Sequence, residues 1–206
     1  RLDLETGAYE NILPHEGRAH YQAPKFFKDG SGILLIADQE REYLSVMVKP
    51  HDAAWLTELA AFEGQDVEAL AISPDQNRIA LVLNRQGWND LVLIGRDGAV
   101  LKQLEMPVVG VVASIAWTPD GMSLIMPVEG AATSGDIWRC DVESGVFTRL
   151  TDAPKAKVKL PAFLEPTVTS VASFDGLDVP YFVYKPERAP GRDGYPVMII
   201  VHGGPE

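Results

Sequence analysis

Cysteine is almost missing from this sequence: Cys140 is the only one among 206 residues. No disulfide can therefore form within the chain, and no thiol-rich metal site can be built from it. Clusters of basic residues are missing as well, and the formal net charge of −11 disfavours nucleic acid as a partner. No apolar run reaches the length of a transmembrane helix and no signal peptide is visible, so we expect no membrane partner. Phosphate-loop, zinc and dinucleotide patterns are also missing, and we expect no cofactor.

A sequence repeat fills the first three quarters of the chain. Its clearest part is a Pro-Asp-Gly turn, or a close variant, between two short apolar runs. The aspartates of these turns are Asp29, Asp75 and Asp120, spaced by 46 and 45 residues. Proline fixes φ, aspartate bonds its own backbone and glycine accepts a positive φ, so this composition favours a tight turn. A second glycine-containing turn recurs in phase, as in Arg96-Asp-Gly98 and Asp141-Val-Glu-Ser-Gly145. Four short strands in about 45 residues are typical of a β-propeller blade.

The repeat predicts three whole blades, at residues 20–66, 67–111 and 112–158, after the last turn of an earlier blade at 3–9. An antiparallel sandwich with accidental turn similarity is the alternative, and the two turns recurring in phase disfavour it. Three blades do not close a ring, and an open propeller leaves unpaired strand edges. We therefore expect either an internal piece of a longer polypeptide or a chain that pairs with other copies of itself as a homo-oligomer.

The composition changes after the third blade. Residues 152–161 form a connector rich in proline and lysine, where the repeat stops. Two β-rich runs, 166–174 and 177–185, then flank Asp175-Gly176 and predict a hairpin. Pro180 indicates that the second strand either lies at an edge or begins late. The fold class predicted is thus mainly β: a partial propeller over 1–160, followed by the start of a second domain over 161–206.

The end of the chain combines a short apolar run with two adjacent glycines. Val197–Val201 are five consecutive apolar residues with turn residues on both sides, which predicts a buried strand of a parallel or mixed sheet. His202, Gly203 and Gly204 follow where such a strand ends, the usual place of ligand sites in α/β proteins. Adjacent glycines let backbone N–H groups approach a ligand, and such donors can stabilise an oxyanion. Alternatively, Gly-Gly-Pro is only a tight turn after a core strand.

The order of these parts resembles the prolyl oligopeptidase family of serine peptidases. The likeness rests on the propeller, the hairpin with Ser173-Phe-Asp-Gly176 and the ending His202-Gly-Gly-Pro205, and it is strongest to the acylaminoacyl-peptidase and dipeptidyl-peptidase-like branches. It implies a propeller that caps an α/β-hydrolase domain with a Ser-Asp-His triad and admits only short peptides. It also implies that Gly204, beside Gly203, gives an oxyanion-hole N–H and that His202 holds the shape of the loop.

The chain has no Gly-x-Ser-x-Gly, so the resemblance implies that the nucleophile and the rest of the triad lie beyond Glu206. This segment alone is expected to be inactive, as part of a serine-type peptidase whose partners are a short peptide substrate and the rest of its own polypeptide. A non-enzymatic propeller binding module and an esterase of the same fold remain alternatives. A cytoplasmic location is expected, and a periplasmic or secreted one stays open because the sequence does not begin with methionine.

Some other polar residues are also candidates for a functional site. His15, His20 and His51 fall in propeller loops, where exposed or capping roles are expected. Glu40 and Glu42 could bind the amino terminus of a peptide, but a solvated hairpin is the expected environment. Cys140 is expected to be a buried strand residue rather than a nucleophile.

Overall fold

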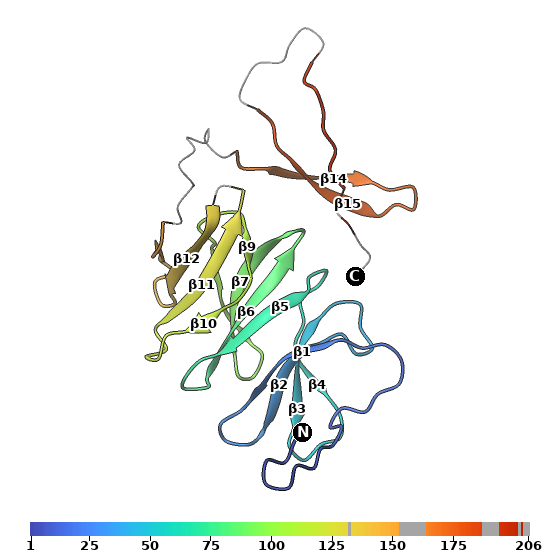
Figure 1. The fold of residues 1–206 in the computed structure, drawn as a ribbon, viewed down its shortest axis with the longest axis vertical. Coiled ribbons are helices and arrows are strands. Elements are labelled where there is room, and N and C mark those ends of the chain that lie inside the picture. Colours follow the sequence, from blue (N-terminus) through green and yellow to red (C-terminus); the bar gives the residue numbers. More distant parts are fainter. Residues whose placement is uncertain (132, 153–163, 187–193, 202, 204–206) are drawn as a thin grey trace. The chain divides into compact units, whose positions relative to one another are not determined.

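The computed structural model describes residues 1–131, 133–152, 164–186, 194–201 and 203. All regular elements in this described part are β-strands (Figure 1). The chain divides into two units, Arg1–Phe163 and Leu164–Glu206. The domain boundary predicted between residues 160 and 161 falls in a stretch outside the described residues. Within those that are described, no helix has the length and apolar character needed to cross a membrane.

The first unit contains three antiparallel sheets, and in the first two every strand pairs with the next one in the chain. Blade 1 consists of β1 (Tyr21–Phe26), β2 (Gly32–Ala37), β3 (Ser45–Pro50) and β4 (Thr57–Ala60). Blade 2 consists of β5 (Val67–Ile72), β6 (Arg78–Arg85), β7 (Trp88–Gly95) and β8 (Val100–Leu104). Blade 3 consists of β9 (Val111–Val112), β10 (Ala116–Trp117), β11 (Ser123–Gly130), β12 (Thr133–Asp141) and β13 (Phe147–Arg149).

The three sheets confirm the predicted blades of a β-propeller. In blade 3 the short strands β9 and β10 both pair with β11, so its first strand is interrupted. The first strands of blades 1 and 2 are also irregular: their register shifts between Gln22 and Lys25 and between Val67 and Ala69. The blades meet beside these first strands, because β5 contacts β1 and β2 of blade 1 and β10 of blade 3.

Blade 2 buries both of its faces. Side chains alternate across a strand, so Ile79, Leu81 and Leu83 of β6 point toward blade 1 while Ala80 and Val82 point toward blade 3. All five are at most 2% exposed. Because neither face meets water, the central strands are continuous apolar runs rather than alternating ones.

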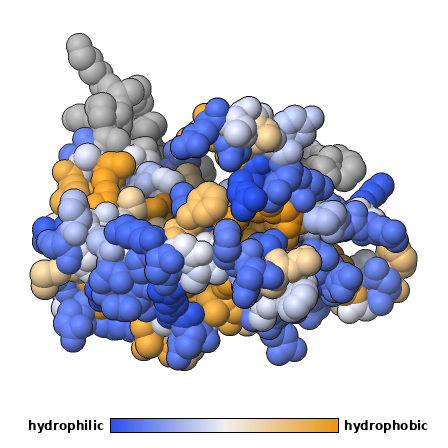
Figure 2. All heavy atoms as spheres, turned by 90° about the horizontal axis from the view of Figure 1, so that it is seen from below, coloured by the Kyte–Doolittle hydropathy of each residue, from blue (hydrophilic) through white to orange (hydrophobic). Residues whose placement is uncertain are grey.

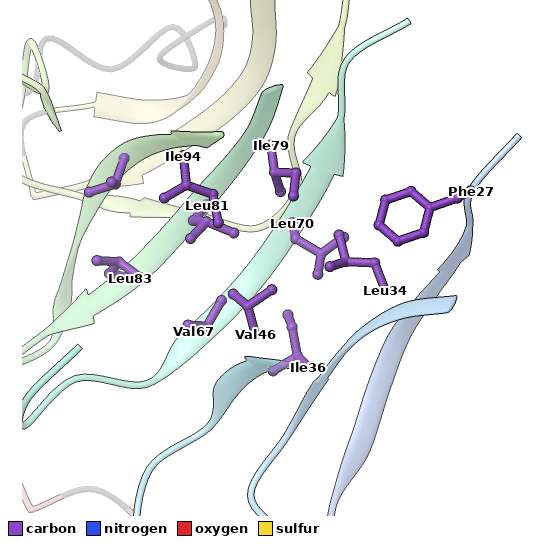
Figure 3. Close-up of a cluster of buried hydrophobic side chains, with 11 residues drawn as sticks. Phe27, Leu34, Ile36, Val46, Val67, Leu70, Ile79, Leu81, Leu83 and Ile94 are labelled. Atoms are coloured by element: carbon purple, nitrogen blue, oxygen red, sulfur yellow. The ribbon is translucent and has the colours of Figure 1, made fainter. Parts of the chain in front are cut away.

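Two cores result, one on each side of blade 2. In the first, side chains from blade 1 and blade 2 point toward one another (Figure 3): Phe27, Leu34, Ile36, Val46, Val67, Leu70, Ile79, Leu81, Leu83, Val92 and Ile94. The second joins blades 2 and 3: Ala80, Val82, Leu91, Leu93, Leu104, Val112, Leu124, Met126, Val128, Cys140 and Val142. On the face drawn in Figure 2, hydrophilic residues cover most of the surface and apolar residues appear as separate patches.

The three repeated turns share one hydrogen-bond pattern. The backbone N–H groups of Phe27, Ser73 and Thr118 donate across their turns at 2.8–3.0 Å. Each turn aspartate accepts a backbone N–H from the residue two positions on, at 2.9–3.2 Å. The repeat therefore reflects one local structure used three times.

Residues 1–10 adopt the other repeated turn. Asp3 N donates to the carbonyl of Ala8 and its side chain accepts from Thr6 N, both at 2.8 Å. Asp141 makes the matching bonds in the β12–β13 turn, with Val146 at 3.0 Å and Ser144 at 2.8 Å. The prediction that this opening segment is the last turn of a blade is confirmed in its local structure.

Arginine side chains connect neighbouring blades at the repeated Asp-containing turns. Arg96 of blade 2 lies over the Phe27 ring, 4.4 Å from its centroid, and donates to Asp29 Oδ2 at 2.5 Å. On the other side, Arg78 lies over the Trp117 ring at 5.0 Å and donates to the carbonyl of Gly121 at 2.7 Å. Hydrogen bonds from the Ser31 hydroxyl and N–H, and then from Arg96, lower the pKa of Asp29 to about 2.

A single residue in the second turn breaks the glycine pattern. Gln76 occupies the place of Gly30 and Gly121, and its φ of 63° lies in the same left-handed region. That conformation is unfavourable for a side chain with a Cβ. Its amide oxygen accepts the N–H of Lys28 at 2.6 Å, so Gln76 gains a bond to blade 1 that glycine could not make.

Gln76→Gly should be more stable than Gln76→Ala by about 1 kcal/mol, because both lose the bond to Lys28 and only glycine relieves the left-handed strain. Equilibrium urea unfolding of the two variants measures the difference. Equal stabilities would show that the backbone of this turn is not strained.

Asp29→Asn should destabilise the protein in a pH-dependent way. Because folding lowers the pKa of Asp29 from 3.8 to about 2, its stabilising contribution is fully present above about pH 4 and disappears as the pH falls through 2. Urea unfolding of wild type and variant across this range should show the gap closing in acid. The gap should also be smaller in an Arg96→Gln background, and a gap independent of pH would contradict the assignment.

Candidate functional site

The second unit contains one described hairpin, β14 (Thr167–Ala172) paired with β15 (Asp178–Val183). Its turn repeats the blade pattern: Gly176 has φ 85°, its N–H donates to Ser173, and Asp175 accepts from Leu177 N. Pro180 pairs with Ser170 in a two-stranded sheet, where every strand is an edge. The predicted hairpin and the edge position of its proline are confirmed.

The prediction of a buried strand over Val197–Val201 is wrong for the structure as described. These residues form no strand, and each is 82–85% exposed. A fully apolar strand is stable only between neighbouring strands and under a covering layer on each face. No described part of the second unit supplies these partners, so the apolar run stays open to solvent.

The predicted oxyanion loop is described at only one of its three positions. Gly203 lies in irregular, exposed backbone, and a Cβ placed on it would meet no atom within 4 Å. His202 and Gly204 lie outside the described residues. The role of all three residues therefore stays a prediction from the sequence.

The other candidate residues take ordinary structural positions. His15, His20 and His51 are exposed, as expected. Glu40 and Glu42 are exposed in the loop between β2 and β3, the solvated environment that was expected. Within the described residues, no group of His, Cys, Asp and Glu side chains could hold a metal ion.

Cys140 is fully buried between blades 2 and 3, which confirms the sequence prediction. Burial, together with the charge of Asp141, raises the pKa of this thiol to about 11. Because the thiolate is the nucleophile in cysteine chemistry, Cys140 is not poised for reaction at neutral pH.

A polar network at the junction of blades 2 and 3 was missed from the sequence. Glu68, on the first strand of blade 2, accepts hydrogen bonds from Asn84 Nδ2 and Asn89 Nδ2, both at 2.7 Å. Asn89 is 2% exposed, and its side-chain oxygen accepts the N–H of Val112 at 2.6 Å. Its own N–H donates to the carbonyl of Gly110. The only sequence signal is a carboxylate within the otherwise apolar run 67–72.

This network lies at one end of the blades, the end at which the chain leaves blade 3. Strand β13 is antiparallel to β12, so it returns to the end that carries the β6–β7 and β11–β12 hairpins. Asn84 and Asn89 pair with each other next to the β6–β7 hairpin. Glu68 is thus at the blade end that leads on to the second unit in the sequence.

An ion pair with a buried carboxylate fixes the chain at this exit. Asp136 is fully buried and accepts from Arg149 Nη2 at 2.5 Å and from the Thr151 hydroxyl at 3.1 Å. Arg149 also pairs with Asp152 at 2.9 Å, and Thr151 accepts the N–H of Ile137. The chain therefore stays attached to β12 up to the last described residue of the first unit.

Comparisons by sequence identify no relative: no protein-family model matches the chain, and no curated protein matches it. Solved structures do match. Prolyl oligopeptidase B from Galerina marginata aligns with 88% of this chain and 26% of its own, with a TM-score of 0.70 and 18% identity. A puromycin hydrolase aligns with 86% of this chain and 28% of its own, with a TM-score of 0.69 and 14% identity. A puromycin-hydrolyzing peptidase of Mycobacterium tuberculosis gives a TM-score of 0.64 at 17% identity.

These similarities define the class of fold. The chain is part of a β-propeller of the kind found in prolyl oligopeptidases and puromycin hydrolases. The likeness to prolyl oligopeptidases expected from the sequence is thus confirmed at the level of fold. The chain spans about a quarter of the length of the structures that it matches. The finer likeness to acylaminoacyl and dipeptidyl peptidases stays a prediction.

Asn89→Ala should destabilise the protein by about 2 kcal/mol, because it leaves buried backbone groups of the blade 2–blade 3 junction without their partner. Asn84→Ala removes only the hydrogen bond of a less buried amide to the Glu68 carboxylate. It should lower the free energy of unfolding by less than about 1 kcal/mol. Thermal or urea unfolding of both variants provides the measurement. Equal losses would mean that the hydrogen bond from Val112 N to the Asn89 side chain does not stabilise the junction.

Proposed function

We propose that this chain is part of a serine peptidase that cleaves short peptides, with its propeller limiting access to the catalytic centre. The observation that carries the proposal is the alignment of 88% of the chain with prolyl oligopeptidase B at a TM-score of 0.70. The order of parts in the sequence supports it, because a propeller is followed by a hairpin and then by His202-Gly-Gly-Pro205.

In this proposal the chemistry is acyl transfer. A serine hydroxyl, placed C-terminal to Glu206, attacks the peptide carbonyl and gives up its proton to the triad histidine. The backbone N–H of Gly204 donates a hydrogen bond to the oxyanion. This hydrogen bond is stronger in the transition state than in the substrate, because negative charge develops on the oxygen. The peptide C–N bond then breaks, the histidine protonates the leaving amine, and water releases the acyl group from the serine.

An esterase of the same fold would use this machinery on an ester, and a binding module would lack the serine altogether. Three of the similar structures are named for the hydrolysis of puromycin, and prolyl oligopeptidase B is named for oligopeptides. Puromycin, proline-containing peptides and simple esters are therefore the substrates to compare in one assay.

The full-length natural polypeptide should react once with a fluorophosphonate serine probe. Intact mass before and after labelling should exceed the 22.5 kDa of this chain and show a single adduct. Peptide mapping should then place the adduct C-terminal to Glu206. A polypeptide near 22.5 kDa without an adduct would eliminate the serine hydrolase and favour a binding module.

A further inference from the structure

Two charged residues are buried in the part of the chain that the structure describes, Lys49 at 8% and Asp136 at 0% exposed. Asp136 has a counter-ion, because it pairs with Arg149. None of the ion pairs formed among the described residues includes Lys49. Burying a charge is costly unless it is paired, because the protein interior solvates it poorly. The burial of Lys49 therefore predicts an anionic partner from outside the described residues.

The blade repeat shows that Lys49 occupies a core position. In its sheet it lies opposite the second residue of β2. The residues at the same place in blades 2 and 3 are Ile94 and Cys140, each fully buried between two blades. Side chains alternate along β3, so Lys49 is on the face that carries Met47, away from blade 2. A cation thus replaces the apolar residue that the other two blades use here.

The ammonium of Lys49 is held by neutral groups only. Its Nζ donates to the carbonyl of Pro50 at 3.0 Å and to the carbonyl of Ala53, both in the connection between β3 and β4. An ammonium has three N–H donors, so these two bonds leave one for a further acceptor. They also orient the ammonium before a ligand arrives, so that little conformational freedom is lost on binding.

Lys49 lines a pocket between blade 1 and the opening segment of the chain. Two other charged residues on its wall, Arg1 and Glu10, pair with each other at 3.0 Å, so the charge of Lys49 is the one left over. The pocket has a volume of about 80 Å³. Pockets for drug-sized ligands have about 300–1,000 Å³, so this one suits a single small group rather than a whole peptide.

We propose that Lys49 binds an anionic oxygen group, a carboxylate or a phosphate, in this pocket. Lysine is a common ligand of such groups because its ammonium acts as a compact point charge. Two sources supply this chemistry: a free small anion, or an aspartate or glutamate side chain of the longer polypeptide expected from the sequence. In the second case Lys49 fastens blade 1 to another part of its own polypeptide. The proposal does not depend on the peptidase function.

Crystal structures of the full-length polypeptide, grown with and without sodium phosphate, test the site directly. A carboxylate oxygen within about 3.2 Å of Lys49 Nζ in both crystals would identify the polypeptide as the source. A phosphate at that place only in the crystals grown with it would identify a free anion. An ammonium surrounded by carbonyls and water alone in both crystals would overturn the proposal. This test needs no variant, so it holds even if replacing Lys49 prevents folding.

Calorimetric titration of the full-length polypeptide with phosphate, at constant ionic strength in chloride, tests the free anion in solution. Lys49→Met should bind phosphate at least about tenfold more weakly than wild type, because a charged hydrogen bond is lost. Lys25→Met removes the same charge from an exposed position on β1 and should bind as wild type does. A crystal phosphate without calorimetric binding, or with equal binding by all three proteins, would be an adventitious ion only and would overturn the site.

The same two variants test a carboxylate of the polypeptide. Lys49→Met should then lower the melting temperature by several degrees more than Lys25→Met, because it leaves a carboxylate at the site without its counter-ion. Added phosphate should leave the melting temperature of wild type unchanged, since the site is already filled. Equal melting temperatures of the two variants would show that no such ion pair forms and would overturn this source.

Discussion

The structure depends on apolar packing between the faces of neighbouring sheets. Blade 2 supplies both of its faces to this packing, with alternate residues of β6 directed to blade 1 and to blade 3. A sheet buried on both sides gains the hydrophobic free energy of two interfaces. It also has no face on which polar residues are favoured, so the polar groups that set the relation between blades are gathered at the strand ends.

At those ends the charged residues act in two ways. Arg78 and Arg96 lie across aromatic rings and bond the turn of the next blade, so that apolar and ionic contacts reinforce each other. At the opposite end, the amides of Asn84 and Asn89 bond the Glu68 carboxylate, and the ion pair of Arg149 with the buried Asp136 holds the exit of the chain. The two amides fix the direction of the Glu68 carboxylate, and Arg149 neutralises the buried carboxylate of Asp136.

The fold is shared with prolyl oligopeptidase B and puromycin hydrolase at only 14–18% identity. A blade needs apolar alternation, short turns and a repeat near 45 residues, and many sequences meet these conditions. Gln76 illustrates the tolerance, because it keeps the left-handed turn in which the other blades use glycine. The second unit shows the opposite case: Val197–Val201 have the composition of a core strand, and without partners among the described residues they are exposed.

The sequence by itself determined the elements whose cause is local. The turns at Asp29, Asp75 and Asp120, the opening turn at 3–9 and the hairpin at Asp175-Gly176 follow from hydrogen bonds and backbone preferences within a few residues. The tertiary structure alone decided which side chains meet across blades. Asn84 and Asn89 reach Glu68 over 16 and 21 residues, and Arg96 reaches Asp29 over 67. No local pattern encodes such contacts, because they depend on how the sheets stack. The burial of an apolar strand likewise depends on its neighbours and not on its own residues.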